Sequence, residues 1–361
     1  MSAETPLLKV TDLAVHFRRR GGLPPLRAVD GVSLDVMPGE TVGLVGESGS
    51  GKTTIGRAIL GLDRPVAGSI RFDDRDITDA TPSERRRLST ELQVVFQDPY
   101  SSLDPRRTVY QTLSEPLIVH QRMSKSESAA QVATALERVG LPHNAASNYP
   151  AAFSGGQRQR IAIARALMLS PRVVICDEVA SALDLSIQAQ VLNLLRTLQA
   201  EFAIGYLFIS HDIAVVRYMS HRIVVLYQGE VMEVGPASLI TATPAHPYTR
   251  ALLSAAPVPD PVRQARLRSE REKTIRSNVS IDEKGPGCPF APRCPYALDI
   301  CRSVRPELDI DPRGTTVACH RHLDLDLAHV GTAGAVPAAA QGDDVRRARL
   351  RTGRSRSEQQ H

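Results

Sequence analysis

The sequence has no tryptophan, few other aromatic residues and no long apolar segment. Phe, Trp and Tyr together make up 4% of its 361 residues. Proteins that bind single-stranded nucleic acid stack bases on aromatic side chains among basic ones. No such interleaving occurs here, so we expect no nucleic-acid partner. The longest apolar stretches are interrupted by Arg165, Arg217 or His221, which argues against a membrane-spanning helix of about 20 apolar residues.

The N-terminus also lacks the pattern of a secretory signal, because residues 18–20, all arginine, are not followed by an apolar stretch. We therefore expect a soluble, cytoplasmic chain. The net charge is +5, and part of the basic excess lies at 85–87 and 346–356. We interpret these as a solvated helix face and a disordered tail. Apolar residues make up 42% of the chain, enough for a large core.

Lysine is scarce, yet one lysine stands in a phosphate-binding loop motif. Residues 46–54 read Gly-Glu-Ser-Gly-Ser-Gly-Lys-Thr-Thr, follow an apolar run at 42–45 and precede a predicted helix. Glycines let backbone N–H groups curl around an anion, and the helix presents its positive N-terminal end to it. Lys52 is expected to reach the β- and γ-phosphates of a nucleoside triphosphate, and Thr53 to coordinate Mg²⁺. The predicted ligands of this loop are Gly46, Ser48, Gly49, Ser50, Gly51, Lys52, Thr53 and Thr54.

Two carboxylates follow a second predicted strand. The apolar run 173–176 leads into Asp177 and Glu178, and catalytic groups gather at the carboxyl ends of strands in parallel α/β sheets. We expect Asp177 to hold Mg²⁺ and Glu178 to polarise the attacking water. His211 follows the next strand, 206–210, and is placed to contact the γ-phosphate.

A polar segment opens the helix that leads to these carboxylates. A Ser-Gly-Gly run at a helix start is receptive to anions, although an ordinary cap and turn would use the same residues. The position of the helix directly before the carboxylates favours the anion site. The segment consists of Ser154, Gly155, Gly156 and Gln157.

Four of the five cysteines gather near the end of the chain, at Cys288, Cys294, Cys301 and Cys319. In a chain expected to be cytoplasmic, such a group favours metal binding over disulfides. The spacing is too wide for a zinc ribbon built on C-x₂-C pairs, but His320 and His322 keep zinc possible. The fifth, Cys176, lies in a predicted core strand and is expected to be inert.

Taken in order, the phosphate loop, Gln97, the Ser154 segment, the two carboxylates and His211 resemble an ATP-binding-cassette (ABC) ATPase over about residues 7–255. The resemblance implies an α/β P-loop NTPase fold with a β-rich N-terminal subdomain and a helical subdomain at about 100–168. In that family two cassettes sandwich two ATP molecules. The segment at 154–157 of one subunit would then bind the γ-phosphate held by Lys52 of the other.

The same resemblance gives roles to residues that are ambiguous on their own. Phe17, which otherwise reads as a core residue, would stack on adenine. Gln97, which otherwise reads as a polar strand end, would sense Mg²⁺ and water. Glu178 would be the general base and His211 the switch at the γ-phosphate. Two departures stand out: Val179-Ala180 replaces the usual Pro-Thr, and Phe153 replaces the usual Leu.

Three stretches, 95–106, 246–253 and 287–295, resemble the cassette subunits of oligopeptide/dipeptide importers, a subfamily that includes nickel and glutathione importers. The resemblance implies an ATPase that energises uptake of oligopeptides or dipeptides, with nickel, glutathione or another small solute as alternatives. It places the chain peripherally on the cytoplasmic face of the cell membrane. The implied partners are a second ATPase (a sister chain favoured over an identical copy), two transmembrane permeases and an extracytoplasmic solute-binding protein.

This subfamily resemblance also bears on the C-terminal part, for which we expect an importer-type extension at 256–325 and a disordered Arg-rich tail at 326–361. In some members a similar cysteine set holds a [4Fe–4S] cluster, for which four thiolates are the usual ligands. An iron–sulfur cluster, zinc and free or regulatory thiols all stay open. A soluble ABC ATPase acting on nucleic acid or ribosomes is an alternative of another class. It usually has two cassettes or long coiled-coil arms, and this sequence has neither.

Overall fold

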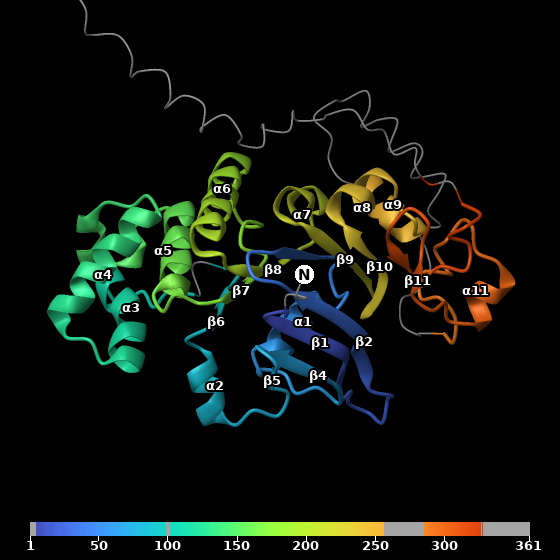
Figure 1. Cartoon of the computed structure of the whole chain (residues 1–361), viewed down its shortest axis with the longest axis horizontal. Helices are drawn as coiled ribbons and strands as arrows, with labels where there is room; N and C mark the ends of the chain where they lie inside the picture. Colours follow the sequence, from blue (N-terminus) through green and yellow to red (C-terminus); the bar gives the residue numbers. More distant parts are fainter. Residues whose placement is uncertain (1–4, 99–101, 256–284, 326, 328–361) are drawn as a thin grey trace, which may run out of the picture. The chain divides into compact units, whose positions relative to one another are not determined.

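A computed structural model of the chain describes residues 5–98, 102–255, 285–325 and 327 (Figure 1). The expectations that fall on the other residues, including the Arg-rich tail, lie outside the described part. The described residues belong to one compact unit.

An eight-stranded mixed sheet forms the core, in the order β11-β12-β10-β9-β3-β8-β7-β6. Its parallel strands β3 and β8 are buried at every residue, as expected where helices cover both faces of a sheet. The register aligns Val45 with Ser210 and Ile209 with Asp177. The strand ends that precede the phosphate loop, the carboxylates and His211 therefore meet at one edge of the sheet. The strands are β3 (Thr41–Val45), β6 (Leu92–Val95), β7 (Val173–Asp177), β8 (Gly205–Ser210), β9 (Arg222–Tyr227), β10 (Glu230–Pro236), β11 (Asp309–Ile310) and β12 (Thr316–Val317).

A second, antiparallel sheet is built from the N-terminal part in the order β2-β1-β4-β5. It corresponds to the β-rich N-terminal subdomain that the resemblance implies. Its inward-facing side chains join those of the core sheet and of α1 in one apolar cluster, which includes Leu8, Val32 and Ile55. The strands are β1 (Leu8–Phe17), β2 (Leu26–Val36), β4 (Ala67–Phe72) and β5 (Arg75–Asp76).

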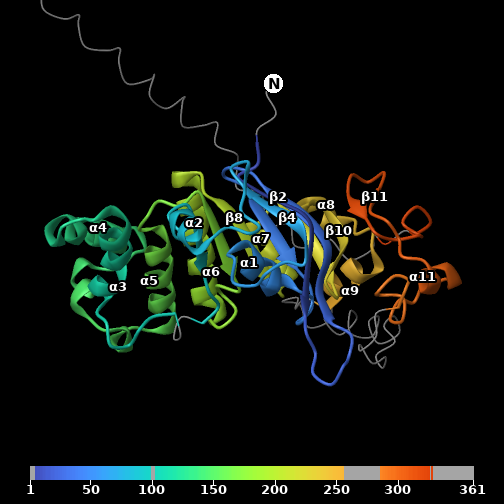
Figure 2. The same cartoon turned by 90° about the horizontal axis from the view of Figure 1, so that it is seen from below.

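The helices begin where the sequence provides capping residues. Thr81 and Ser124, each followed by Glu three residues later as the capping-box pattern requires, form capping boxes, and Thr108 and Ser154 form two more. The helical insertion after β6 contains α3 and α4, which lie beside α5 in both views (Figure 1, Figure 2). The helices are α1 (Lys52–Ile59), α2 (Pro82–Leu88), α3 (Val109–Pro116), α4 (Lys125–Arg138), α5 (Gly155–Leu167), α6 (Leu185–Phe202), α7 (Ile213–Met219), α8 (Ala237–Ala242), α9 (Pro247–Ala255) and α11 (Asp299–Ser303).

The C-terminal region continues the core sheet instead of forming a sheet of its own. β12 pairs antiparallel with β10, and β11 pairs with β12 at the outer edge. Beneath this edge the buried carboxylate of Glu233 accepts hydrogen bonds from the backbone N–H groups of Ala245 and His246, at 2.8 and 3.0 Å. The hydroxyl of Thr315 donates a third at 3.4 Å. Residues before and after the predicted boundary at 255 thus share one sheet and one buried polar site.

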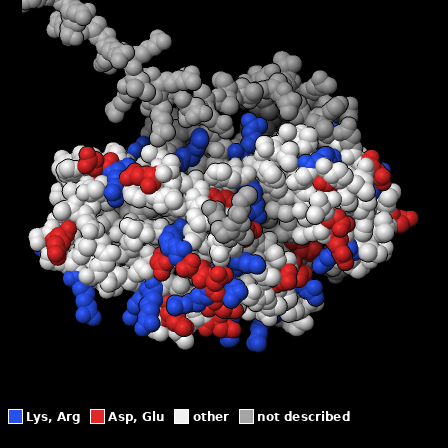
Figure 3. Space-filling view, viewed as in Figure 1, with Lys and Arg blue, Asp and Glu red and all other residues white. Residues whose placement is uncertain are grey.

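On the face shown in Figure 3, basic and acidic side chains are interspersed. Within the described residues, no helix is both long and apolar enough to cross a bilayer.

Candidate nucleotide site

The phosphate loop connects β3 to α1 and depends on glycine at both ends. A Cβ atom on Gly46 would lie 2.2 Å from the carbonyl oxygen of Leu226. Gly51 has a φ of 99°, and a Cβ there would lie 2.4 Å from the carbonyl oxygen of Ala28. No L-residue with a side chain fits either place without moving the backbone. The loop is thereby wrapped tightly against β2 and β9.

Lys52 bends back over this loop. Its ammonium group donates hydrogen bonds to the carbonyl oxygens of Gly46 and Glu47, at 2.8 and 2.9 Å, and to Ser50 Oγ at 3.3 Å. Burial lowers the pKa of Lys52, and the negative charges of Glu178 and Asp177 partly offset that effect. The loop thus holds a largely buried cation at its centre.

The two carboxylates lie beside the loop, as the sequence predicts. Asp177 Oδ1 accepts a hydrogen bond from Thr53 Oγ1 at 3.2 Å, and burial raises the pKa of Asp177. Glu178 has a φ of 50°, so the chain makes a sharp turn immediately after β7. Its Oε1 lies 3.2 Å from His211 Nδ1. Oxygen ligands suited to Mg²⁺ and a carboxylate–imidazole pair are therefore neighbours.

The segment from Ser154 to Gln157 lies at the start of α5 and not at the phosphate loop of its own chain. Ser154 caps α5: its Oγ accepts a hydrogen bond from the Gln157 backbone N–H, and Gln157 Oε1 accepts one from the Ser154 N–H. Gly156 packs against α6, where a Cβ would lie 2.3 Å from Ile187 Cγ2. Among the described residues, no hydrogen bond joins this segment to the phosphate loop. It does not complete the site of its own chain.

Phe17 and Gln97 both lie at ends of strands. Phe17 is the last residue of β1, and 39% of its surface is exposed. The alternative interpretation of Phe17 as a core residue is therefore wrong. Gln97 is exposed, two residues after β6. Neither residue contacts the carboxylates through a hydrogen bond within the described part of the chain.

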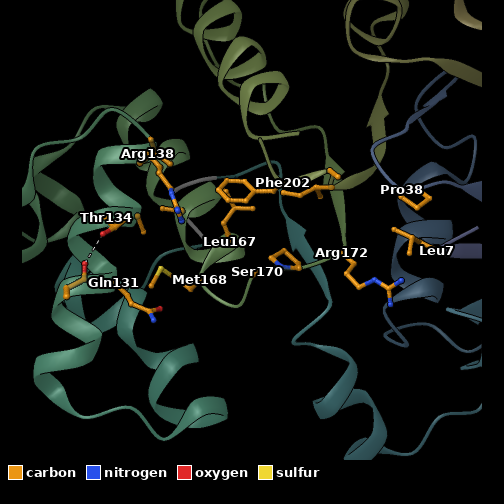
Figure 4. Close-up of a pocket in the computed structure, with 17 residues that line it drawn as sticks. Leu7, Pro38, Gln131, Thr134, Arg138, Leu167, Met168, Ser170, Arg172 and Phe202 are labelled. Carbon is orange, nitrogen blue, oxygen red and sulfur yellow. Dashed lines mark hydrogen bonds between the residues drawn. The ribbon is translucent and has the colours of Figure 1, made fainter. Parts of the chain in front are cut away.

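A cavity of about 670 Å³ lies elsewhere, between α4, the end of α5 and the end of α6 (Figure 4). Gln131, Arg138, Met168 and Phe202 line it. No residue of the phosphate loop and neither carboxylate lines this cavity, so we do not assign it to the nucleotide. No pattern in the sequence predicts this cavity.

The four clustered cysteines do come together. All four line one small cavity of about 20 Å³, with His246 and Phe290 beside them. Burial raises the pKa of Cys288 to about 12 and that of Cys319 to about 11, so both are protonated at neutral pH. In the described ranges, no three His, Cys, Asp or Glu side chains are grouped to hold a metal ion. The four thiols thus share one cavity but do not form a preformed metal site.

Sequence reasoning missed that Glu47 of the phosphate loop contacts Tyr248 and Arg293. The carboxylate of Glu47, in the loop, accepts two hydrogen bonds from Arg293, at 2.8 and 2.9 Å. The backbone N–H of Glu47 donates to the hydroxyl of Tyr248 at 2.9 Å. Tyr248 and Arg293 stand in stretches that resemble the importer subfamily, but no sequence pattern links them to the loop.

Comparison with known proteins shows the family of the chain. The family "ABC transporter" matches residues 29–181, and the family "Oligopeptide/dipeptide transporter, C-terminal region" matches residues 232–301. A putative peptide import ATP-binding protein of Brucella ovis is 48% identical over 319 residues, which cover 88% of this chain and 98% of the relative. The chain belongs to the ABC transporter ATP-binding proteins.

Further similarities agree with this ABC cassette assignment. A probable peptide ABC transporter ATP-binding protein of Sinorhizobium fredii is 45% identical over 329 residues, covering 90% of this chain and 92% of the relative. A dimeric ATP-binding cassette bound to ADP and Pi is 31% identical with a TM-score of 0.58, covering 64% of this chain and 98% of that one. A component of an ABC transporter complex from Clostridium perfringens is 29% identical with the same TM-score, covering 65% and 90%. The predicted family, fold class and transport-coupled ATPase activity are confirmed.

Proposed function

We propose that this cassette is the ATP-hydrolysing subunit of an ABC importer for oligopeptides or dipeptides. The observation that carries the proposal is the joining, in one structural unit, of the phosphate loop and its carboxylates with a C-terminal region of the oligopeptide/dipeptide transporter type. The names of the relatives from Brucella ovis and Sinorhizobium fredii point to the same solute class.

In the proposed ATP site, the loop and Lys52 bind the phosphates. Phosphate oxygens are charged acceptors and form stronger hydrogen bonds than the neutral carbonyls that Lys52 contacts now. Thr53 and Asp177 supply oxygen ligands that fit Mg²⁺, which would neutralise charge on the phosphates when bound. The other loop ligands are those predicted from the sequence.

Hydrolysis requires a base beside the γ-phosphate. We assign that role to Glu178, whose carboxylate can accept a proton from the attacking water. His211, 3.2 Å away, orients the carboxylate and reaches toward the γ-phosphate. Gln97 at the end of β6 would complete the contacts to water and Mg²⁺, and Phe17 would stack on adenine.

The site needs a second cassette, because the segment from Ser154 to Gln157 does not reach its own loop. Leu185, at the start of α6, is 84% exposed and offers apolar surface that a partner could cover. We propose that a second cassette covers it, a sister chain in preference to an identical copy. The segment of each cassette would then contact the γ-phosphate held by the other.

The remaining partners follow from the importer function. We propose two transmembrane permeases and an extracytoplasmic solute-binding protein, with the cassette on the cytoplasmic face of the membrane. The exposed Gln97, next to the 37% exposed Phe96, is the expected contact of a permease helix. ATP-driven closure of two cassettes would move that helix.

The test is a pull-down of the tagged Glu178→Gln variant from detergent-solubilised native membranes in ATP and Mg²⁺. Slow hydrolysis should keep the cassette dimer closed, so two multi-span permeases and a second cassette should copurify. Their binding protein can then be screened with peptides, nickel and glutathione, which separates the proposed solute from the alternatives. Recovery of soluble chains, ribosomes or DNA alone would refute the importer assignment.

We further propose that the four cysteines bind a [4Fe–4S] cluster. Four thiols on one cavity give the usual number of ligands. The cavity of about 20 Å³ would have to widen, and the thiols would have to lose their protons on binding. Anaerobic purification should yield a brown protein with about four irons per chain, compared with none in a Cys288→Ser, Cys294→Ser variant. Colourless, iron-free wild-type protein would contradict the proposal.

A further inference from the structure

Glu47 is the second residue of the phosphate loop, and its polar groups connect the loop to the rest of the molecule. Its carbonyl oxygen accepts hydrogen bonds from Lys52 Nζ at 2.9 Å and from the Ser50 N–H at 3.1 Å. Its N–H and its carboxylate point the other way, to Tyr248 and Arg293. Glu47 therefore contacts both Lys52 and the C-terminal part of the chain.

The C-terminal partners of Glu47 are held rigidly. Tyr248, on α9, is fully buried, and its ring packs against Phe290 with centroids 5.3 Å apart. The guanidinium of Arg293 lies 5.7 Å from the ring centres of Tyr227 and Phe290 and donates a hydrogen bond to the Tyr227 hydroxyl at 3.3 Å. A planar guanidinium fixed in this way presents two parallel donors to a carboxylate in one orientation.

We propose that Arg293 and Tyr248 are positioning residues for ATP binding, which hold the phosphate loop in its binding shape through Glu47. The proposal rests on the function proposed for that loop. Backbone N–H groups bind phosphate well only when they already converge on one point, since ordering them on binding costs affinity. Because Glu47 is fixed on its outer side, its carbonyl group and Lys52 are kept in register with the glycines.

This arrangement gives the cysteine-containing region a part in the nucleotide site. Arg293 lies between Cys288 and Cys294 in the sequence, in the loop that brings both cysteines to their cavity. A displacement of this loop moves the guanidinium away from Glu47. The C-terminal region thereby sets the affinity of the cassette for ATP.

The Arg293–Glu47 pair could instead serve only to attach the C-terminal region, and a matched ion pair separates the two possibilities. Arg305, also in the C-terminal region, forms ion pairs with Glu230 of β10 at 3.3 Å and with Asp30 of β2 at 3.8 Å. These pairs attach the region to the rest of the cassette, but they do not involve the phosphate loop. Arg305→Met should loosen the region without changing the loop.

The experiment measures the Kd of a fluorescent ATP analogue with Mg²⁺ for the full-length chain. We expect about tenfold weaker binding for Arg293→Met, the effect of losing one strong charged contact. Arg293→Lys, which retains the charge but not the paired donors, should lie in between. Tyr248→Phe should also weaken binding, and Arg305→Met should not.

Each outcome bears on the proposal. Binding by folded Arg293→Met within twofold of wild type overturns it, as does an equal loss in Arg305→Met. If Arg293→Met does not fold, as judged by its thermal unfolding, then Arg293→Lys and Tyr248→Phe decide by the same twofold criterion. If the wild-type chain itself binds no ATP analogue, the proposed function fails, and that failure is recognised before any variant is compared.

Discussion

Glu178→Gln is expected to lower the rate of ATP hydrolysis by about 100- to 10,000-fold, the usual contribution of a general base. Glutamine retains the size of the side chain and an oxygen near His211 Nδ1, but it cannot accept the proton of the attacking water. ATP affinity should change by less than about twofold, because Glu178 is not expected to contact the phosphates in the ground state. Steady-state phosphate release and ATP-analogue binding, measured on the same preparation, separate the two effects.

A suitable control is Glu137→Gln, which removes an exposed carboxylate of α4 far along the chain from the site. It should hydrolyse ATP at the wild-type rate. A loss of less than tenfold in Glu178→Gln would mean that another group accepts the proton, and the assignment of the base would have to be abandoned.

Lys52→Ala is expected to weaken ATP binding by at least about 100-fold, because two charged hydrogen bonds to phosphate oxygens are lost. The folded chain should tolerate the change, since the phosphate loop is exposed at Ser48 and Gly49. Titration with the fluorescent ATP analogue gives the affinity, and thermal unfolding without nucleotide gives the stability.

Another of the few lysines in the chain provides a control for Lys52→Ala. Lys125 is exposed at the start of α4, so Lys125→Ala should bind ATP as the wild type does. ATP affinity retained within tenfold in Lys52→Ala would show that the nucleotide binds elsewhere in the chain.

The grouping of the phosphate loop, the two carboxylates and His211 could be predicted because these residues follow the ends of strands that sequence patterns reveal. Apolar runs before Gly46, Asp177 and His211 identified buried strands, and the parallel α/β arrangement placed their ends together. Helix starts were equally readable, as the capping boxes at Thr81 and Ser124 show. Each of these signals is local, so one stretch of sequence contains all of it.

The connections made by the C-terminal region could not be predicted in this way. β11 and β12 have two residues each, too few for an alternating pattern. The contact of Arg293 with Glu47 joins residues 246 positions apart, and neither residue type is unusual on a surface. The cysteines fall between these cases: their grouping was predicted, but spacing alone does not determine the chemistry of the cavity that they line.

The pairing of β10 with β12 also has a consequence for biosynthesis. Glu233 pairs with Val317, and at about 5–20 residues per second the ~80 residues between them take several seconds to translate. During that interval the nascent cassette has a sheet edge with unpaired backbone groups, the kind of surface from which aggregation starts. A message cut short after codon 255 would make this exposure permanent. Pairing with β12 covers this edge only after the residues up to Val317 have been translated.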